Sequence, residues 1–217
     1  MSVVLGCTDP QTWGPSMDEA VNALARGGLV VLPTDTVYGL GADAFQPEAV
    51  AALASVRRRV PAVPPPVLVP DARTLDGLCT DVPDAVRDLV QAFWPGGLTV
   101  ICRSQPSLAW DLGDAAGTVA VRVPDHAAAL ALLRRTGPLA VTGAHLSGSP
   151  ATRNAQDAQD QLGPSVSVYL DAGPAPGTTP STIVDATGGR LRVVRAGAVG
   201  LELLRTVADV EPVGEDT

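Results

Sequence analysis

The sequence predicts an α/β protein built on a mixed parallel and antiparallel sheet flanked by helices. Short apolar runs alternate with longer segments in which apolar residues recur at helical spacing, and this alternation is typical of α/β folds. Near the end of the chain, three apolar runs follow without a long helical segment between the last two, which favours a mixed sheet over a purely parallel one. With only 3% aromatic residues, the core must rest on Val, Leu, Ala and Ile.

The first elements are predicted from helix and strand boundary residues. Ser16 and Glu19 form a capping-box pattern ahead of apolar residues at helical spacing, and Gly27 and Gly28 end that helix. The run Leu29–Leu32, closed by a proline, indicates a buried strand. Pro47 begins a second helix that runs to about Val56.

The same reasoning predicts the remaining elements. Strands are expected at short apolar runs, namely Val67–Val69, Leu98–Cys102, Thr118–Val123, Leu139–Thr142, Val166–Leu170, Ser181–Val184 and Leu191–Val194. Helices are expected from Pro83 to about Phe93, from a cap at Asp125 to Arg135, and over Ala155–Leu162 and Leu201–Ala208. We expect one domain over residues 1–210 and an acidic, frayed tail over residues 211–217.

Composition excludes several classes of function. The chain of 217 residues has a net charge of −8, which argues against strong non-specific binding of nucleic acid. It contains no lysine, so it has neither a Walker A lysine nor a Schiff-base lysine. The 2 histidines make a zinc site improbable, and 3 widely spaced cysteines are typical of a reducing compartment. No stretch approaches the ~20 apolar residues of a membrane helix, so we expect a cytoplasmic protein with no membrane partner.

Two segments of the first half could bind a ligand. Pro33–Asp43 follows a buried strand and places hydroxyls, a carboxylate and glycines in a turn, which suits a small polar ligand or, equally, local backbone hydrogen bonds. The adjacent Arg57, Arg58 and Arg59 could bind phosphates, although by themselves they fit a solvated helix end better. In Phe93–Thr99, a helix is followed by a tight turn, and Trp94 favours a lid over the core, whereas Thr99 is more open to a ligand role.

Three later segments carry further polar residues. Arg122 lies in an apolar strand, where it must either pair with a carboxylate or point into a polar cavity, and we expect the cavity. Thr142–Gly148 follows another strand but lacks the G-x-S-x-G pattern, so His145 and Ser147 do not indicate a hydrolase nucleophile. Gly173–Pro180 is either a loop that closes over a ligand or a surface connection.

Taken in order, these segments resemble the YrdC family of threonylcarbamoyl-AMP synthases. The strongest pieces are P-T-D-T-V-Y-G-L-G-A-D-A (Pro33–Ala44), F-W-P-G-G-L-T (Phe93–Thr99), V-A-V-R-V-P-D-H (Val119–His126), S-T-I-V-D (Ser181–Asp185) and R-A-G (Arg195–Gly197). The resemblance implies a twisted mixed sheet around a concave cationic cavity. It also implies a nucleotidyltransferase that joins L-threonine, bicarbonate and ATP, accompanied by Mg2+, into threonylcarbamoyl-adenylate, which downstream proteins use to modify tRNA.

The resemblance also implies roles for residues at matching positions. Thr36, Ser181, Thr182 and Arg122 would bind threonine. The ATP site would comprise Arg57, Arg59, Thr99, Gly143, Ala144, His145 and Arg195. The implied chemistry needs no covalent nucleophile and no metal ligand from the protein, because positioning and charge stabilisation supply the catalysis.

The chain departs from the family pattern in a group of four positions. The family has K-x-R after the second helix and S-x-N in the fifth segment, whereas this chain has Arg57, Arg59, Gly143 and His145 there, so three of the four differ. Losing a hydrogen bond to a charged ligand costs about 1.5–3 kcal/mol. Three hypotheses remain open: an active synthase with an adapted nucleotide site, a paralogue with a different carbamoyl-adenylate substrate, and a non-catalytic binder of nucleotide or RNA.

Overall fold

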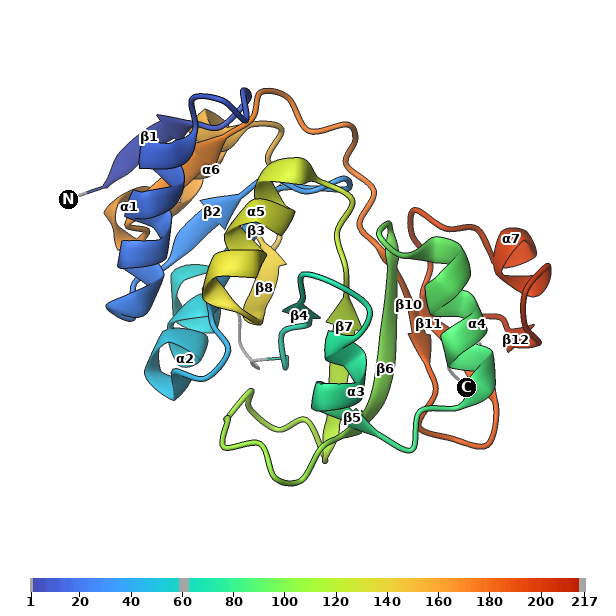
Figure 1. The fold of residues 1–217 in the computed structure, drawn as a ribbon. Coiled ribbons are helices and arrows are strands. Elements are labelled where there is room, and N and C mark those ends of the chain that lie inside the picture. The colour runs from blue at the N-terminus through green and yellow to red at the C-terminus, as the bar shows by residue number, and fades with distance from the viewer. Residues whose placement is uncertain (1, 59–62, 215–217) are drawn as a thin grey trace.

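The computed structural model describes residues 2–58 and 63–214, and these form one mixed sheet with helices on both faces (Figure 1). Among the described residues the sheet has 12 strands, in the order β1-β9-β2-β3-β8-β4-β7-β6-β10-β11-β12, with β5 paired to β6. The strands are β1 Val3–Gly6, β2 Val30–Leu32, β3 Gly39–Asp43, β4 Val67–Leu68, β5 Cys79–Thr80, β6 Leu98–Ser104, β7 Thr118–Arg122, β8 Leu139–Gly143, β9 Val168–Asp171, β10 Thr182–Asp185, β11 Leu191–Arg195 and β12 Val210–Glu211.

The sheet contains both parallel and antiparallel pairs, which confirms the predicted fold class. For example, β6 runs parallel to β10 but antiparallel to β7. The helices of the described chain are α1 Gly14–Ala25, α2 Pro47–Val56, α3 Thr74–Leu78, α4 Asp84–Phe93, α5 Ala127–Thr136, α6 Ala155–Leu162 and α7 Leu201–Arg205, and a short 3-10 turn covers Gly163–Ser165. No helix in this part of the chain is long and apolar enough to span a membrane.

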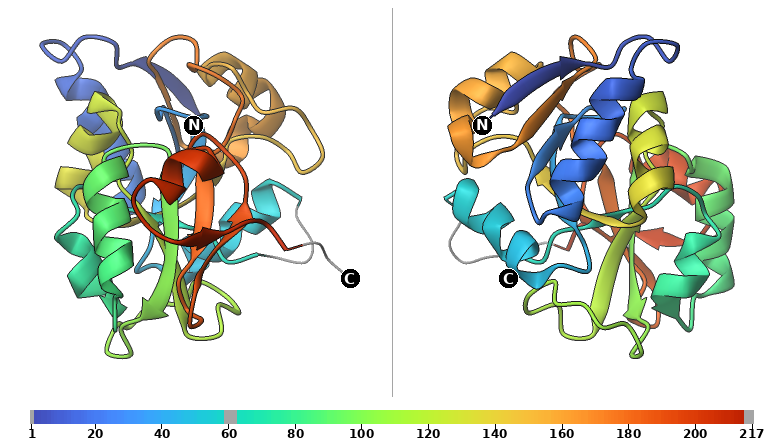
Figure 2. Two further views of the ribbon diagram at one scale, coloured as in Figure 1. Left: turned by 90° about the vertical axis from the view of Figure 1, so that its right-hand side faces the viewer. Right: turned by 60° about the vertical axis from the view of Figure 1, so that its left-hand side comes forward.

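The two faces of the sheet bury two apolar layers. Figure 2 shows α1 and α5 side by side on one face of the sheet. Helix α6 lies on the opposite side of strands β1 and β9 from α1 (Figure 2). Strand β2 shows how the layers arise, because Val30 and Leu32 face the layer that contains α1 and α5, while Val31 faces the other layer. Side chains alternate between the faces of a strand, so a strand covered on both faces is apolar throughout.

Two predicted helix caps are wrong. Helix α1 begins at Gly14, so Ser16 lies inside it, and its hydroxyl donates to the carbonyl of Gly6 at 2.8 Å in place of capping. Helix α5 has His126 at its N-cap position, and the backbone N–H of Asp125 donates to Asp35. For Ser16, a contact from outside the helix takes the hydroxyl that local sequence assigned to the cap.

Several boundaries also differ from the prediction. Gly39–Asp43, expected to belong to a turn, forms the central strand β3 between β2 and β8. Glu211, expected to open a frayed tail, pairs through β12 with Arg192 of β11. The last helix ends at Arg205, and β9 begins at Val168. The strands β1, β5 and β12 and the helix α3 were not predicted, since elements of two to five residues carry little periodicity.

Candidate active site

The candidate residues around Thr36 and Ser181 gather where four strand ends meet, whereas those around Arg57 lie at the ends of α2 and β8. The register pairs Leu98 with Thr182 and Ile183 with Arg195, so the beginnings of β6 and β10 lie beside the end of β11. The end of β7 lies at the same side, because β7 runs antiparallel to β6. The connection between β2 and β3 extends across to these strand ends (Figure 1). Segments far apart in the chain therefore surround one region.

The Thr36 cluster, which we define as Thr34, Asp35, Thr36 and Arg122, is buried at this region. The guanidinium of Arg122 is held by the Asp35 carboxylate at 2.6 Å, the Thr36 hydroxyl at 2.9 Å and the carbonyl of Gly96 at 2.8 Å. Arg122 is 5% exposed. Burial lowers the pKa of this guanidinium, and Asp35 acts in the opposite direction. Arg122 thus pairs with a carboxylate, and our expectation that it points into a polar cavity is wrong.

The hydrogen bonds of the Thr36 cluster also fix the direction of one hydroxyl. Thr34 donates its only hydroxyl proton to the carbonyl of Val37 at 2.6 Å. The Thr34 and Thr36 oxygens lie 3.1 Å apart, so Thr36 is the donor in that contact. The proton of Thr36 is therefore committed to Thr34. Arg122 donates to one of the two lone pairs of Thr36 at 2.9 Å, so one accepting lone pair remains. Thr36 is therefore suited to a ligand group that donates, such as an amine.

The Ser181 cluster, defined as Thr99, Ser181 and Arg195, joins β6, β10 and β11. Arg195 donates to the Ser181 carbonyl at 3.0 and 2.8 Å and to its hydroxyl at 3.0 Å, and that hydroxyl lies 2.8 Å from Thr99 Oγ1. Gly197 permits this approach, since a Cβ there would lie 2.4 Å from the carbonyl oxygen of Pro180. The cluster combines a cation with two hydroxyls.

Thr182 lies beside the Ser181 cluster but has a different environment. Its hydroxyl donates to the carbonyl of Val199 at 2.6 Å and accepts from the N–H of Val199 at 2.9 Å. The residue is 1% exposed. This pair of bonds attaches the segment before α7 to the start of β10, so the geometry gives Thr182 a structural task.

The Arg57 cluster, defined as Arg57, Thr142, Gly143 and His145, lies at the ends of α2 and β8. Arg57 is 7% exposed and donates to the carbonyl of His145 at 2.8 Å and to the hydroxyl of Thr142. Its Nη2 atom lies 3.1 Å from His145 Nε2. Arg57 is therefore buried at a helix end that sequence alone made look solvated. Arg59 lies outside the described residues.

The neighbouring Ala144 has no exposed surface, and its N–H donates to the carbonyl of Tyr38 at 2.9 Å. This bond continues the pairing of β3 with β8 beyond Gly143 and connects the Arg57 cluster to the β2–β3 connection that carries Thr36. Ala144 thus contributes backbone geometry to the site.

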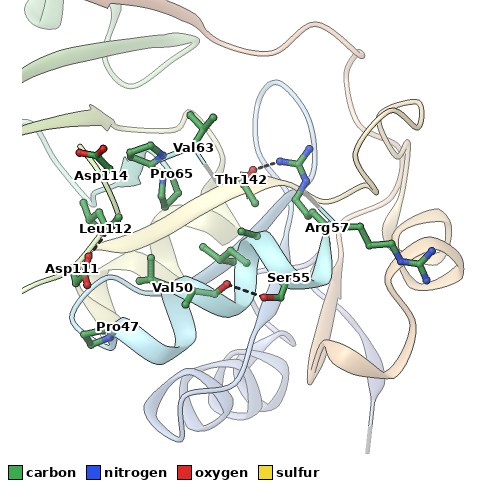
Figure 3. A pocket seen from close by; sticks show the side chains of 16 residues that line it. Pro47, Val50, Ser55, Arg57, Val63, Pro65, Asp111, Leu112, Asp114 and Thr142 are labelled. Carbon is green, nitrogen blue, oxygen red and sulfur yellow. Dashed lines mark hydrogen bonds between the residues drawn. The ribbon is translucent and has the colours of Figure 1, made fainter. Parts of the chain in front are cut away.

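A pocket of about 490 Å³ adjoins the Arg57 cluster (Figure 3). Its walls are mostly apolar side chains, including Val50 and Leu112, and Arg57 and Thr142 lie at one end, connected by a hydrogen bond. The described lining carries two arginines and two aspartates, Arg57, Arg58, Asp111 and Asp114. The expected cationic cavity therefore stays a prediction. Among the described residues, no group of three or more His, Cys, Asp or Glu side chains could hold a metal ion.

Sequence reasoning missed three participants in these clusters. Asp35 and Thr34 entered only as part of the Pro33–Ala44 motif, although a carboxylate is one of the partners that an arginine within an apolar strand needs, and Asp35 follows the buried strand β2. Thr142 was passed over because nothing in the local sequence reveals that Arg57, 85 residues away, donates to it.

Known protein families and relatives with similar sequences indicate the family of this chain. The profile of the Sua5/YciO/YrdC family, described as telomere recombination, matches residues 22–197. A putative threonylcarbamoyl-AMP synthase of Mycobacterium tuberculosis is 48% identical over 211 residues, which cover 97% of each chain. The threonylcarbamoyl-AMP synthase of Bacillus subtilis is 33% identical over 195 residues, 89% of this chain and 56% of that protein.

Solved structures give the same result. Sua5 of Pyrococcus abyssi complexed with L-threonine superposes with a TM-score of 0.89 at 27% identity, and the match covers 97% of this chain and 62% of that one. YciO of Escherichia coli superposes with a TM-score of 0.83 at 25% identity, and the match covers 94% of this chain and 100% of that one. On the match of the family profile and the identity to these relatives, the chain belongs to the Sua5/YciO/YrdC family.

Proposed function

We propose that this protein is a threonylcarbamoyl-AMP synthase that joins L-threonine, bicarbonate and ATP. The names of relatives that match over nearly the whole chain support the activity. The observation that carries the proposal is the buried Thr36 hydroxyl, whose proton is committed to Thr34 and which therefore accepts from a ligand amine. We further propose a cytoplasmic enzyme with one domain, which extends to Glu211 because β12 belongs to the sheet, and whose product passes to proteins that modify tRNA.

The reaction begins at the amine of threonine. The amine attacks the carbon of bicarbonate, a C–N bond forms, and hydroxide leaves and takes up a proton as water. A carbamate oxygen then attacks the α-phosphorus of ATP, and pyrophosphate leaves. Thr36 accepts a hydrogen bond from an N–H of the amine and so fixes the direction of the amine lone pair. This orientation points the amine nitrogen at the carbon of bicarbonate and so favours the attack.

The cationic clusters stabilise the charge that develops at phosphorus. In the proposal, Arg195 and Thr99, together with Arg57, serve the nucleotide, joined by Arg59, Gly143, Ala144 and His145, while the adjacent Ser181 serves threonine. Arg122 acts on threonine only indirectly, through Thr36, and Thr182, which the resemblance assigned to threonine binding, has a structural role through its two bonds to Val199. Mg2+ would enter with the triphosphate as part of the substrate.

The test is pyrophosphate release by the purified protein with ATP, Mg2+ and bicarbonate, with and without L-threonine. We expect threonine-dependent release and threonylcarbamoyl-adenylate in the mass spectrum. Thr36→Val, which removes only the hydroxyl, should lower the rate by about 10- to 100-fold, since a hydrogen bond to a charged or reacting group is lost. Thr12→Val, at an exposed threonine, is the matched control.

Two other outcomes would change the assignment. Release that depends on another amino acid would indicate a paralogue with a different carbamoyl-adenylate product. Nucleotide binding without release under any of these conditions would indicate a binding protein that has lost the reaction.

A further inference from the structure

The ring of His145 occupies the space of a side chain at position 143. A Cβ on Gly143 would lie 2.4 Å from His145 Cε1 and 2.8 Å from Nδ1. The N–H of His145 donates to the carbonyl of Gly143 at 2.9 Å, so the chain turns tightly and folds the ring back over residue 143. Any larger residue at 143 would displace the ring, because atoms of a packed interior do not approach this closely.

The ring of His145 is in turn an acceptor for Arg57. A guanidinium has no accepting atom, so in the 3.1 Å contact Arg57 Nη2 donates and His145 Nε2 accepts. The other ring nitrogen, Nδ1, therefore carries the proton of the neutral imidazole. The contact with Arg57 therefore determines which tautomer of His145 is present.

The segment from Thr142 to Ser147 holds Arg57 from several sides. Besides the ring, Arg57 Nε donates to the His145 carbonyl at 2.8 Å and Nη1 donates to Thr142, while the carbonyl of Arg57 accepts from Ser147 N at 2.9 Å. These acceptors surround a planar fork. A lysine has three N–H groups on a single nitrogen, so it cannot reach acceptors that are spaced to meet the three nitrogens of a planar guanidinium.

We propose that Arg57, Thr142, Gly143 and His145 form one interdependent unit that fixes the Arg57 guanidinium at one end of the pocket, in an orientation to meet a phosphate of ATP. Within it, His145 is a positioning residue that acts through Arg57, and Gly143 is required because it leaves room for the ring. The three departures from K-x-R and S-x-N are thus one compensated exchange and not three separate losses. The nature of the ligand rests on the proposed function.

The experiment compares ATP binding, in the absence of threonine, among single and double variants. Gly143→Ser and His145→Ala should each weaken the Kd for ATP by about ten-fold or more, because each releases a hydrogen bond to a charged group. The double variant G143S/H145A should be no weaker than H145A alone, since both changes remove the same contact. His145→Gln, which keeps an accepting atom near the place of Nε2, should retain most of the affinity.

One control variant and one control measurement separate a positioning role from a general folding defect, and the wild-type protein separates ATP binding from the proposed reaction. Gly189→Ser, at a glycine with open space around it, should leave ATP binding unchanged. The Kd for L-threonine should not change in any of these variants, whereas a general loss of structure would weaken it as well. Multiplicative effects of G143S and H145A, or full ATP affinity of G143S, would overturn the inference, and so would a wild-type protein that binds no ATP. A wild-type protein that binds ATP but releases no pyrophosphate would refute only the proposed function.

Discussion

Replacing Asp35 with alanine tests whether the Thr36 cluster is held together by a buried ion pair. Asp35 Oδ1 lies 2.6 Å from Arg122 Nη2, and the side chains are 17% and 7% exposed. Removing one partner of a buried pair leaves an uncompensated charge and costs about 3–5 kcal/mol. Asp35 also accepts from the N–H of Asp125 at 2.9 Å, so the loss falls at two contacts.

The magnitude converts into a large change in melting temperature. For chains of this length, about 1 kcal/mol shifts the Tm by roughly 2–4 °C, so D35A should lower it by about 6–20 °C. Asp18→Ala is the matched control, because Asp18 lies 2.7 Å from Arg135 while the side chains of Arg135 and Asp18 are 42% and 63% exposed. An exposed pair contributes about 0–1 kcal/mol, so D18A should shift the Tm by less than about 4 °C.

Thermal unfolding followed by circular dichroism, together with the Kd for L-threonine, measures both consequences. We expect D35A to weaken threonine binding as well, because Arg122 no longer holds the Thr36 hydroxyl in its accepting direction. If D35A and D18A lower the Tm equally, burial does not amplify the Asp35–Arg122 interaction and the reasoning is refuted. Asp35→Asn keeps the accepting oxygen and loses only the charge, so it should lower the Tm less than D35A. This variant replaces D35A in the comparison if D35A does not fold.

Two further predictions concern neighbouring residues. Thr182→Val should lower the free energy of unfolding in urea by about 1–3 kcal/mol, since it leaves backbone groups of Val199 without their partner, and should leave the Kd for threonine unchanged; a weakened Kd would return Thr182 to the substrate site. Burial lowers the pKa of His126 from its ordinary value near 6.5, against the opposing effect of Asp35 and Asp125. The unfolded chain then binds more protons just below pH 6.5, so this contribution to stability is complete above that pH and is lost as the pH falls towards the folded pKa. His126→Gln should therefore flatten the decline of stability between about pH 7 and pH 5.5, and an unchanged slope would contradict the assignment.

The elements predicted well are those whose boundaries are set by local chemistry. Helix α2 begins at Pro47 and ends at Val56 as expected, because proline has a fixed φ and no N–H to lose in the first turn. Strand β3 was missed for the opposite reason. Glycine disfavours strands locally, yet a Cβ on Gly39 would lie 2.6 Å from Val141 Cγ1, so the pairing with β8 requires glycine.

The candidate site was located by motif, but its contacts were not predictable. Arg122 and Asp35 are 87 residues apart, and Arg57 and His145 are 88 apart. Whether an arginine meets a carboxylate, a hydroxyl or a ring nitrogen depends on which segments the sheet brings together, and no local pattern encodes that. The expectation that Arg122 points into a cavity failed for this reason.

A shared arrangement of three arginines, of which Arg57 and Arg122 are buried and Arg195 is exposed, explains how a chain without lysine supports such a site. Arg57, Arg122 and Arg195 each donate to a backbone carbonyl, of His145, Gly96 and Ser181 respectively. A carbonyl anchored by its own backbone holds the planar fork in one orientation, so the positive charge needs no reorganisation when a ligand arrives. A lysine ammonium on a flexible stem would have to be ordered by the ligand itself. The exchange of lysine for arginine at position 57 therefore extends to this position a principle that the other two arginines already follow, which is why we regard the altered group as adapted and not decayed.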